Sequence, residues 1–200
     1  MFHTRTCLWG TLSLAFLIAA NAHAAPPVIF NTGVDSAGAV LPDGAVDPHY
    51  IVGPGTTVLV NSALSPTPPA DTLSAWIMPA TNFGAGSYLY STTFVESTPG
   101  SITINGQWAA YVTGLDISLN GVSSGDTTPN PGFTNWTPFS ITGTAIAGTN
   151  TLDFRASEDP RFSPNTGIRV EISSVTPEPA GLALLGLGGF GLLSRRRPAR

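Results

Sequence analysis

A strict alternation of side-chain types over residues 88–95 most limits the folds open to this chain. Tyr88, Tyr90 and Phe94 fall on one face of an extended strand, and the residues between them fall on the other. Shorter segments of similar character are separated by turn residues and predict further strands at 56–60, 101–104, 107–112, 115–119, 138–142, 151–156 and 168–173. The 22 glycines and 18 prolines among 200 residues exclude a helical bundle. Together these features predict an all-β fold, a β-sandwich or jelly roll.

The last predicted strands have an inward and an outward side. Asn120-Gly121 favours a tight hairpin after the strand at 115–119, because both positions can take positive φ. The apolar side chains that we expect to face the core are Leu152, Phe154, Ile168, Val170 and Ile172. The charged side chains that alternate with them, and that we expect to face solvent, are Asp153, Arg155, Arg169 and Glu171. An exposed ladder of this kind contributes under about 1 kcal/mol.

The first 24 residues have the pattern of a secretory signal peptide. A short region with Arg5 precedes an apolar run over residues 12–20, and the segment closes on an Ala-x-Ala site with cleavage after Ala24. The only cysteine, Cys7, lies within this segment, so the exported chain has neither disulfides nor a thiolate nucleophile. Removal of the segment also leaves His49 as the only histidine.

The C-terminal residues have an equally clear order. Pro177, Glu178 and Pro179 precede an uncharged apolar run over 180–193, and a basic cluster follows with Arg195, Arg196 and Arg197. A helix of this length spans about 21 Å, short of the roughly 30 Å of a bilayer's hydrocarbon core. The sequence therefore predicts a short, marginal transmembrane helix with its arginines on the cytoplasmic side.

This tail resembles that of the PEP-CTERM proteins of Gram-negative bacteria, which carry the same tripeptide, helix and basic end in this order. The resemblance implies export through the translocon, a transient stay in the inner membrane, and cleavage by an exosortase-type protease near Pro177–Pro179. It also implies delivery to the cell surface or extracellular matrix, where such proteins accompany exopolysaccharide. An ordinary tail anchor that is never cleaved is the alternative interpretation.

The predicted domains are therefore a signal peptide at 1–24, an exported β-sandwich at 25–176 and a sorting and anchor segment at 177–200. The exported part has eleven acidic residues against three arginines, a formal net charge of −8. This charge excludes a nucleic-acid-binding surface and disfavours attraction of an anionic polymer through bulk charge.

The exported part carries a second resemblance, at residues 116–121, 148–154 and 167–171. An apolar strand ending in Asn-Gly and a later Gly-x-Asn-x-Leu before a core strand make this stretch similar to galactose-binding-like jelly rolls. Those domains accompany glycosidases, and many of them bind sugars while others only scaffold. The resemblance implies a fold and leaves the ligand open.

Aromatic side chains are the candidate sugar-stacking residues, because a pyranose presents an apolar C–H face to a ring. The rings in question are Trp76, Trp108, Trp136, Tyr88, Tyr90 and Tyr111. A core position is the alternative for each tryptophan, since a sandwich of this size buries most of its large rings, and Trp108 is assigned to the core.

Asp43, Asp47 and His49 form the densest group of ionisable residues in the exported part. Asp43 and Asp47 are two possible calcium ligands. The competing interpretation is a pair of turns, at Pro42-Asp43-Gly44 and Asp47-Pro48, whose carboxylates bond the local backbone. No cofactor other than this possible calcium ion is predicted.

The sequence does not point to an enzyme. Gly121-Val-Ser-Ser-Gly125 matches a nucleophile elbow around Ser123, but no helix pattern follows and no histidine lies after His49. We therefore expect a non-catalytic surface or matrix protein that contacts carbohydrate. The alternatives are a glycan hydrolase or lyase with an unrecognised site and a purely structural module.

Overall fold

The computed structural model describes residues 25–61, 73–81, 84–158 and 167–177, which form β-strands and no helix. The predicted signal peptide and the helix and basic cluster of the tail lie outside these residues, among which no helix is long and apolar enough to cross a membrane. The strands are β1 (Val46–Val52), β2 (Thr56–Val60), β3 (Ile77–Pro79), β4 (Gly86–Glu96), β5 (Gly100–Ala110), β6 (Thr113–Leu119), β7 (Val122–Ser123), β8 (Thr137–Ala145), β9 (Gly148–Glu158) and β10 (Ile168–Pro177).

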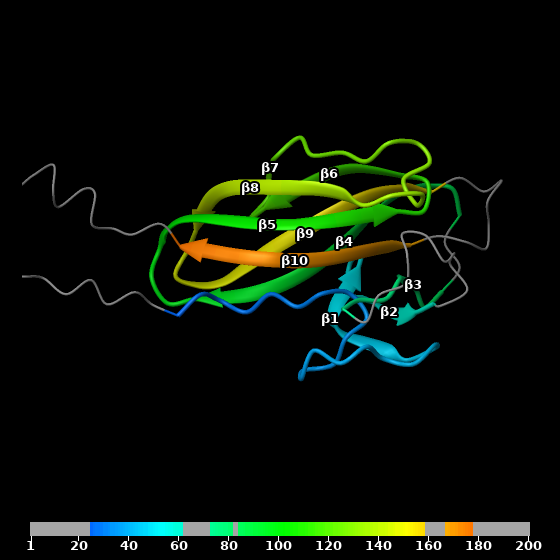
Figure 1. Ribbon diagram of the computed structural model, residues 1–200, viewed down its shortest axis with the longest axis horizontal. Helices are drawn as coiled ribbons and strands as arrows, with labels where there is room; N and C mark the ends of the chain where they lie inside the picture. Colours follow the sequence, from blue (N-terminus) through cyan, green and yellow to red (C-terminus); the bar gives the residue numbers. More distant parts are fainter. Residues whose placement is uncertain (1–24, 62–72, 82–83, 159–166, 178–200) are drawn as a thin grey trace, which may run out of the picture.

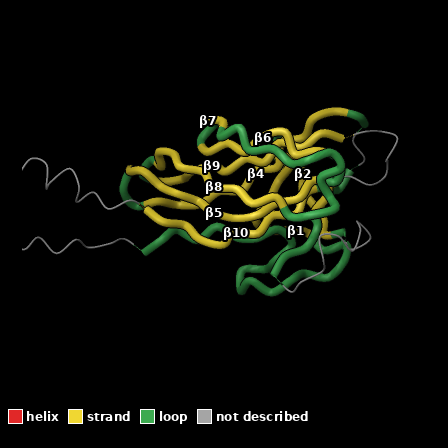
Figure 2. The backbone as a smooth tube through the Cα atoms, turned by 45° about the horizontal axis from the view of Figure 1, so that its top comes forward, coloured by secondary structure: helices red, strands yellow, loops and turns green. Residues whose placement is uncertain are grey.

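The strands make two layers that face each other across one core (Figures 1 and 2). The hydrogen-bonded order is β7-β6-β9-β4-β1-β2-β3-β10-β5-β8, with every pairing antiparallel. The Phe154 ring of β9 lies 5.7 Å from that of Trp108 in β5 and 5.9 Å from that of Phe139 in β8, although these strands are not neighbours in the order. Apart from the hairpin strand β7, the chain changes layer at each step from β4 to β10, which is a jelly-roll arrangement.

The predicted all-β fold is confirmed, and most predicted strands lie within observed ones. The expected core residues Leu152, Phe154, Ile168 and Val170 are fully buried, and Ile172 is half-buried. Asn120 and Gly121 have φ of 51° and 78°, which confirms the tight turn between β6 and β7. Two predicted strands, 101–104 and 107–112, are one continuous strand, β5. The strands β1 and β3 were not predicted.

Both ends of the described chain leave the sandwich at the same end, the left of Figure 1. The blue start of the described chain lies there, and so does the tip of β10, where Pro177 pairs with Ile102 near the start of β5. The other end of β10 is Ile168, nine residues earlier, which is about 30 Å away at the rise of a strand. The two ends of β10 therefore lie at opposite ends of the domain.

Candidate functional site

Arg169 and Glu171, which were predicted to face solvent, are buried, and that prediction was wrong. Only 3% of Arg169 and 6% of Glu171 are exposed, because further segments cover the outward side of β10. The Thr32 backbone N–H donates to the Val170 carbonyl at 3.1 Å, and Ser74 bonds to both charged side chains. Asp153 is also buried, at 9% exposed, while Arg155 is exposed as predicted.

The buried charges form one hydrogen-bonded network on the outward side of β10 and β5. Arg169 Nε donates to Ser74 Oγ at 2.7 Å, and Ser74 Oγ donates to Glu171 Oε1 at 2.7 Å. Gln107 Nε2 donates to the other oxygen of Glu171 at 2.7 Å, and Arg169 Nη2 lies 3.6 Å from Glu171 Oε1. A buried charge that is paired and hydrogen-bonded in this way is held in one orientation.

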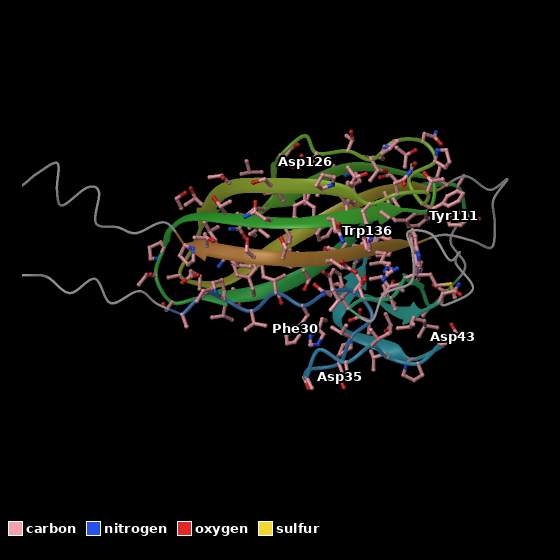
Figure 3. All side chains as sticks on the ribbon, in the orientation of Figure 1. Phe30, Asp35, Asp43, Tyr111, Asp126 and Trp136 are labelled. Atoms are coloured by element: carbon pink, nitrogen blue, oxygen red, sulfur yellow. The ribbon has the colours of Figure 1, made fainter. Side chains whose placement is uncertain are left out.

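Aromatic side chains gather over this network. The guanidinium carbon of Arg169 lies 4.9 Å from the centroid of the half-buried Trp136 ring, a cation–π distance. Half-buried Tyr111 and Phe133 stack at 5.2 Å, and both pack with Trp136 against the buried pair Trp76 and Ala109. Figure 3 shows Trp136 over the β5 and β10 ribbons and Tyr111 at the end of the sandwich opposite the tip of β10.

One polar atom in this cluster has no partner among the described residues. Trp76 is 4% exposed, and its indole Nε1–H is buried without an acceptor. An indole N–H usually has a hydrogen-bond partner when it is buried. The cluster thus combines partly accessible rings, a fixed cation and an unused donor, which is the composition of a small-molecule site.

The structure separates the predicted stacking rings Trp136, Trp76, Tyr90 and Tyr88. Trp136 lies in the cluster and is partly accessible. Trp76 lies beneath it and is buried, so its ring offers no accessible stacking face, which corrects the prediction. Tyr90 is a correction of the same kind, because it points into the main core and is 0% exposed. Tyr88 is half-buried in the other layer, where its hydroxyl donates to the Gly84 carbonyl.

Sequence reasoning missed Phe133 as a member of this site, whereas Tyr111 was among the predicted stacking rings. Phe133 stands three residues before Trp136 in one loop, which was a usable signal. Tyr111 comes directly after the last residue of β5, and only the three-dimensional packing places it on Phe133.

Asp47 has a structural role in the cluster that was considered for calcium. Its carboxylate accepts hydrogen bonds from the backbone N–H groups of Gly33 at 2.6 Å, His49 at 2.7 Å and Tyr50 at 3.2 Å. Asp43 is exposed, whereas Asp47 is 2% exposed, and no group of three or more possible metal ligands occurs among the described residues. These hydrogen bonds agree with the turn interpretation of Asp47. They connect the segment before β1 to the start of that strand.

Asp47 makes the stability of the fold depend on pH. Burial raises the pKa of its carboxyl above the ordinary 3.8, although the three backbone donors oppose the change. Because the folded state binds this proton more tightly than the unfolded state does, the protonated Asp47 carboxyl stabilises the fold. This contribution is fully present below pH 3.8 and is lost as pH rises through the folded-state pKa. We expect the stability advantage of the wild type over Asp47→Asn to shrink from acid to neutral pH in urea unfolding. An advantage that grows toward neutral pH would contradict this expectation.

Ser123 lies in the second strand of the hairpin that Asn120-Gly121 predicts. It is exposed in β7, and its Oγ donates to Asp116 Oδ1 at 2.8 Å. Gly125 N–H donates to the same oxygen at 3.1 Å. Asp116 therefore fastens the end of the hairpin.

Three solved structures are similar to this chain at low sequence identity. A family 35 carbohydrate-binding module from Clostridium thermocellum is 12% identical over 77% of this chain and all of its own, with a TM-score of 0.44. The corresponding module from Paenibacillus barcinonensis is 14% identical over 64% of this chain and 94% of its own, with a TM-score of 0.39. The Podospora anserina GH26-CBM35 mannanase is 16% identical over 78% of this chain and 29% of its own, with a TM-score of 0.37.

The similarity of these structures is low, and the jelly-roll assignment rests on the strand order described above. No curated protein matches the chain. The PEP-CTERM protein-sorting motif matches residues 175–197, which confirms the resemblance of the tail and implies export and membrane-anchored sorting. Its first residues, Val175 to Pro177, belong to β10. The chain thus carries a PEP-CTERM protein-sorting motif that continues directly from the last strand of a jelly-roll β-sandwich.

Proposed function

We propose that this protein is a surface or matrix component that binds carbohydrate, without turnover, at the cluster around Trp136. The observation that carries the proposal is the Trp136 ring, which is partly accessible and fixed from behind by the buried Arg169 guanidinium. A ring held in place loses little conformational entropy when a sugar stacks on it. Tyr111 and Phe133 extend the apolar area beside it.

The position of the cluster in the domain supports this role. Arg169 stands at the beginning of β10, and the sorting motif starts near the end of the same strand, at Val175, about 20 Å away. A protein held through this motif would therefore present Trp136 away from its attachment point. Such an orientation suits contact with exopolysaccharide outside the cell.

The test is a glycan and exopolysaccharide binding screen on the purified full chain, followed by Trp136→Ala. We expect saturable binding by the wild type and an affinity at least tenfold lower in the variant, about 1.4 kcal/mol. Tyr88→Ala is the matched control, because Tyr88 is also a half-buried ring but lies in the other layer. Urea unfolding checks that both variants remain folded.

Each other outcome points to a different function. A folded wild type that binds no glycan contradicts the proposal and favours a purely structural module. Release of products from a glycan favours the hydrolase or lyase alternative. Binding that requires added calcium would favour the interpretation of Asp43 and Asp47 as metal ligands. Asp47 would then have to give up hydrogen bonds to the backbone.

A further inference from the structure

The outward face of β10, β5 and β8 is a continuous surface of small uncharged polar side chains beyond the Trp136 cluster. Alternation along each strand sends every second side chain outward. On β5 these residues follow Gln107 toward the start of the strand, and neighbours on β8 and β10 stand beside them. The set, named here the hydroxyl face, is Ser101, Thr103, Asn105, Ser140, Thr142, Thr144, Ser174 and Thr176.

Strand register and side-chain hydrogen bonds hold this face in order. Thr103 pairs with Thr142 of β8, and their hydroxyl oxygens lie 2.9 Å apart. Asn105 pairs with Ser174 of β10, and its Nδ2 donates to the serine hydroxyl at 3.0 Å. Groups that are already arranged by their neighbours can bind a partner with little further loss of entropy.

The charge of the hydroxyl face selects the class of partner. Among the described outward residues of the three strands only Arg169 and Glu171 are charged, and both are buried in their mutual network at the Trp136 end. Of the eleven acidic residues of the exported part, only Glu171 belongs to β5, β8 or β10. An uncharged partner would therefore meet no electrostatic repulsion on this face and would leave no buried charge unpaired.

The polarity of the face disfavours a protein partner. The large apolar side chains that are exposed among the described residues are Val28, Val40, Val46, Ile51, Leu73, Val95, Leu115, Val122 and Ile146, none of which lies in β5, β8 or β10. The buried centre of a protein–protein interface is usually apolar and rich in aromatic residues. Hydroxyl and amide groups instead both donate and accept hydrogen bonds, as the hydroxyl groups of a sugar do.

The hydroxyl face begins where the Trp136 cluster ends. Gln107 bonds to Glu171 within the cluster, and Asn105 is the next outward residue along β5. From Gln107 to Ser101 the strand extends about 20 Å, enough for several linked sugar units. We propose that an extended, uncharged polysaccharide stacks on Trp136 and continues along the hydroxyl face. This inference rests on the proposed function and adds the charge class and the length of the ligand.

The test compares short and long neutral ligands on the full chain. Calorimetry is carried out with the di- and hexasaccharides of cellulose, mannan and β-1,3-galactan, and with an alginate hexasaccharide as the anionic probe. We expect a neutral hexasaccharide to bind about tenfold more tightly than its disaccharide, with an affinity that salt leaves unchanged. The double variant Thr103→Val with Thr142→Val is expected to lose about tenfold in hexasaccharide affinity and nothing in disaccharide affinity.

The control is a cross-strand pair of threonines in the other layer. Thr93 and Thr151 are directly paired between β4 and β9, so Thr93→Val with Thr151→Val removes an equivalent cross-strand pair and is expected to change neither affinity. Equal affinity for short and long ligands, equal behaviour of the two double variants, or tighter binding of alginate overturns this inference. Failure of the proposed function is distinct, because then no disaccharide binds and Trp136→Ala has no effect.

Discussion

Replacement of Arg169 by methionine is expected to lower the free energy of unfolding by about 3–5 kcal/mol, because it leaves a buried carboxylate without its cation. Arg169 and Glu171 are 3% and 6% exposed, so water does not reach Glu171 freely once the guanidinium is gone. Ser74 loses its Arg169 donor as well, and with it a tie between the segment before β3 and strand β10. Urea unfolding of the full chain measures the loss.

A double variant separates the loss of the cation from the loss of packing. Arg169→Met with Glu171→Leu removes both charges, and we expect it to recover most of the lost stability, since apolar replacement of a buried pair is often close to neutral. A single variant that costs under about 1 kcal/mol would show that water or another group solvates Glu171. Additive costs in the double variant would show that the pair is not coupled.

Arg169 also shows where sequence reasoning stops. The alternation over 168–173 correctly placed Ile168 and Val170 inside and Arg169 and Glu171 on the opposite side of the strand. The pattern reports only the two sides of a strand and not whether something covers the outward one. Here residues around Thr32 and Ser74, 138 and 97 positions away from their partners Val170 and Glu171, make the cover.

The missed strand β1 has a similar cause. Asp43, Asp47 and the prolines beside them are turn-forming residues, and they predicted a pair of turns where β1 begins. Asp47 does bond the local backbone as expected, yet Val46 to Val52 also pair with β2 and β4. Pairing with distant strands overrode the local preference, which one sequence alone does not reveal.

The candidate site was predictable only in part. Trp136 was among the predicted stacking rings, and its exposure follows from its place in a loop rich in proline and glycine. Its partners Arg169 and Tyr111 come from β10 and from the end of β5, and no spacing in the sequence connects these positions. The hydroxyl face likewise appears only after register places Thr103 beside both Thr142 and Thr176.

Gly106 explains why one long strand was predicted as two. A glycine within a strand pattern suggests a break, but it also occurs where another group approaches the backbone closely. A Cβ built on Gly106 would lie 2.3 Å from the Glu171 carbonyl oxygen and 2.6 Å from Cζ of Phe139. The bulge in β10 between Ile172 and Ser174 lies directly opposite this position. Gly106 therefore lets β5 run straight through a crowded point between β10 and β8.

Gly106→Val is accordingly expected to destabilise the fold by about 3 kcal/mol, the upper part of the range for overpacking, because a backbone carbonyl cannot turn away as a side chain can. Gly100→Val is the matched control, since it lies in the same strand with no atom within 4 Å of its Cβ position. Equal stability of the two variants in urea would show that β10 can shift to accommodate the valine side chain without a loss of stability. Because the displaced carbonyl belongs to Glu171, whose side chain carries the network under Trp136, any folded Gly106→Val protein should also lose the affinity that Trp136→Ala loses.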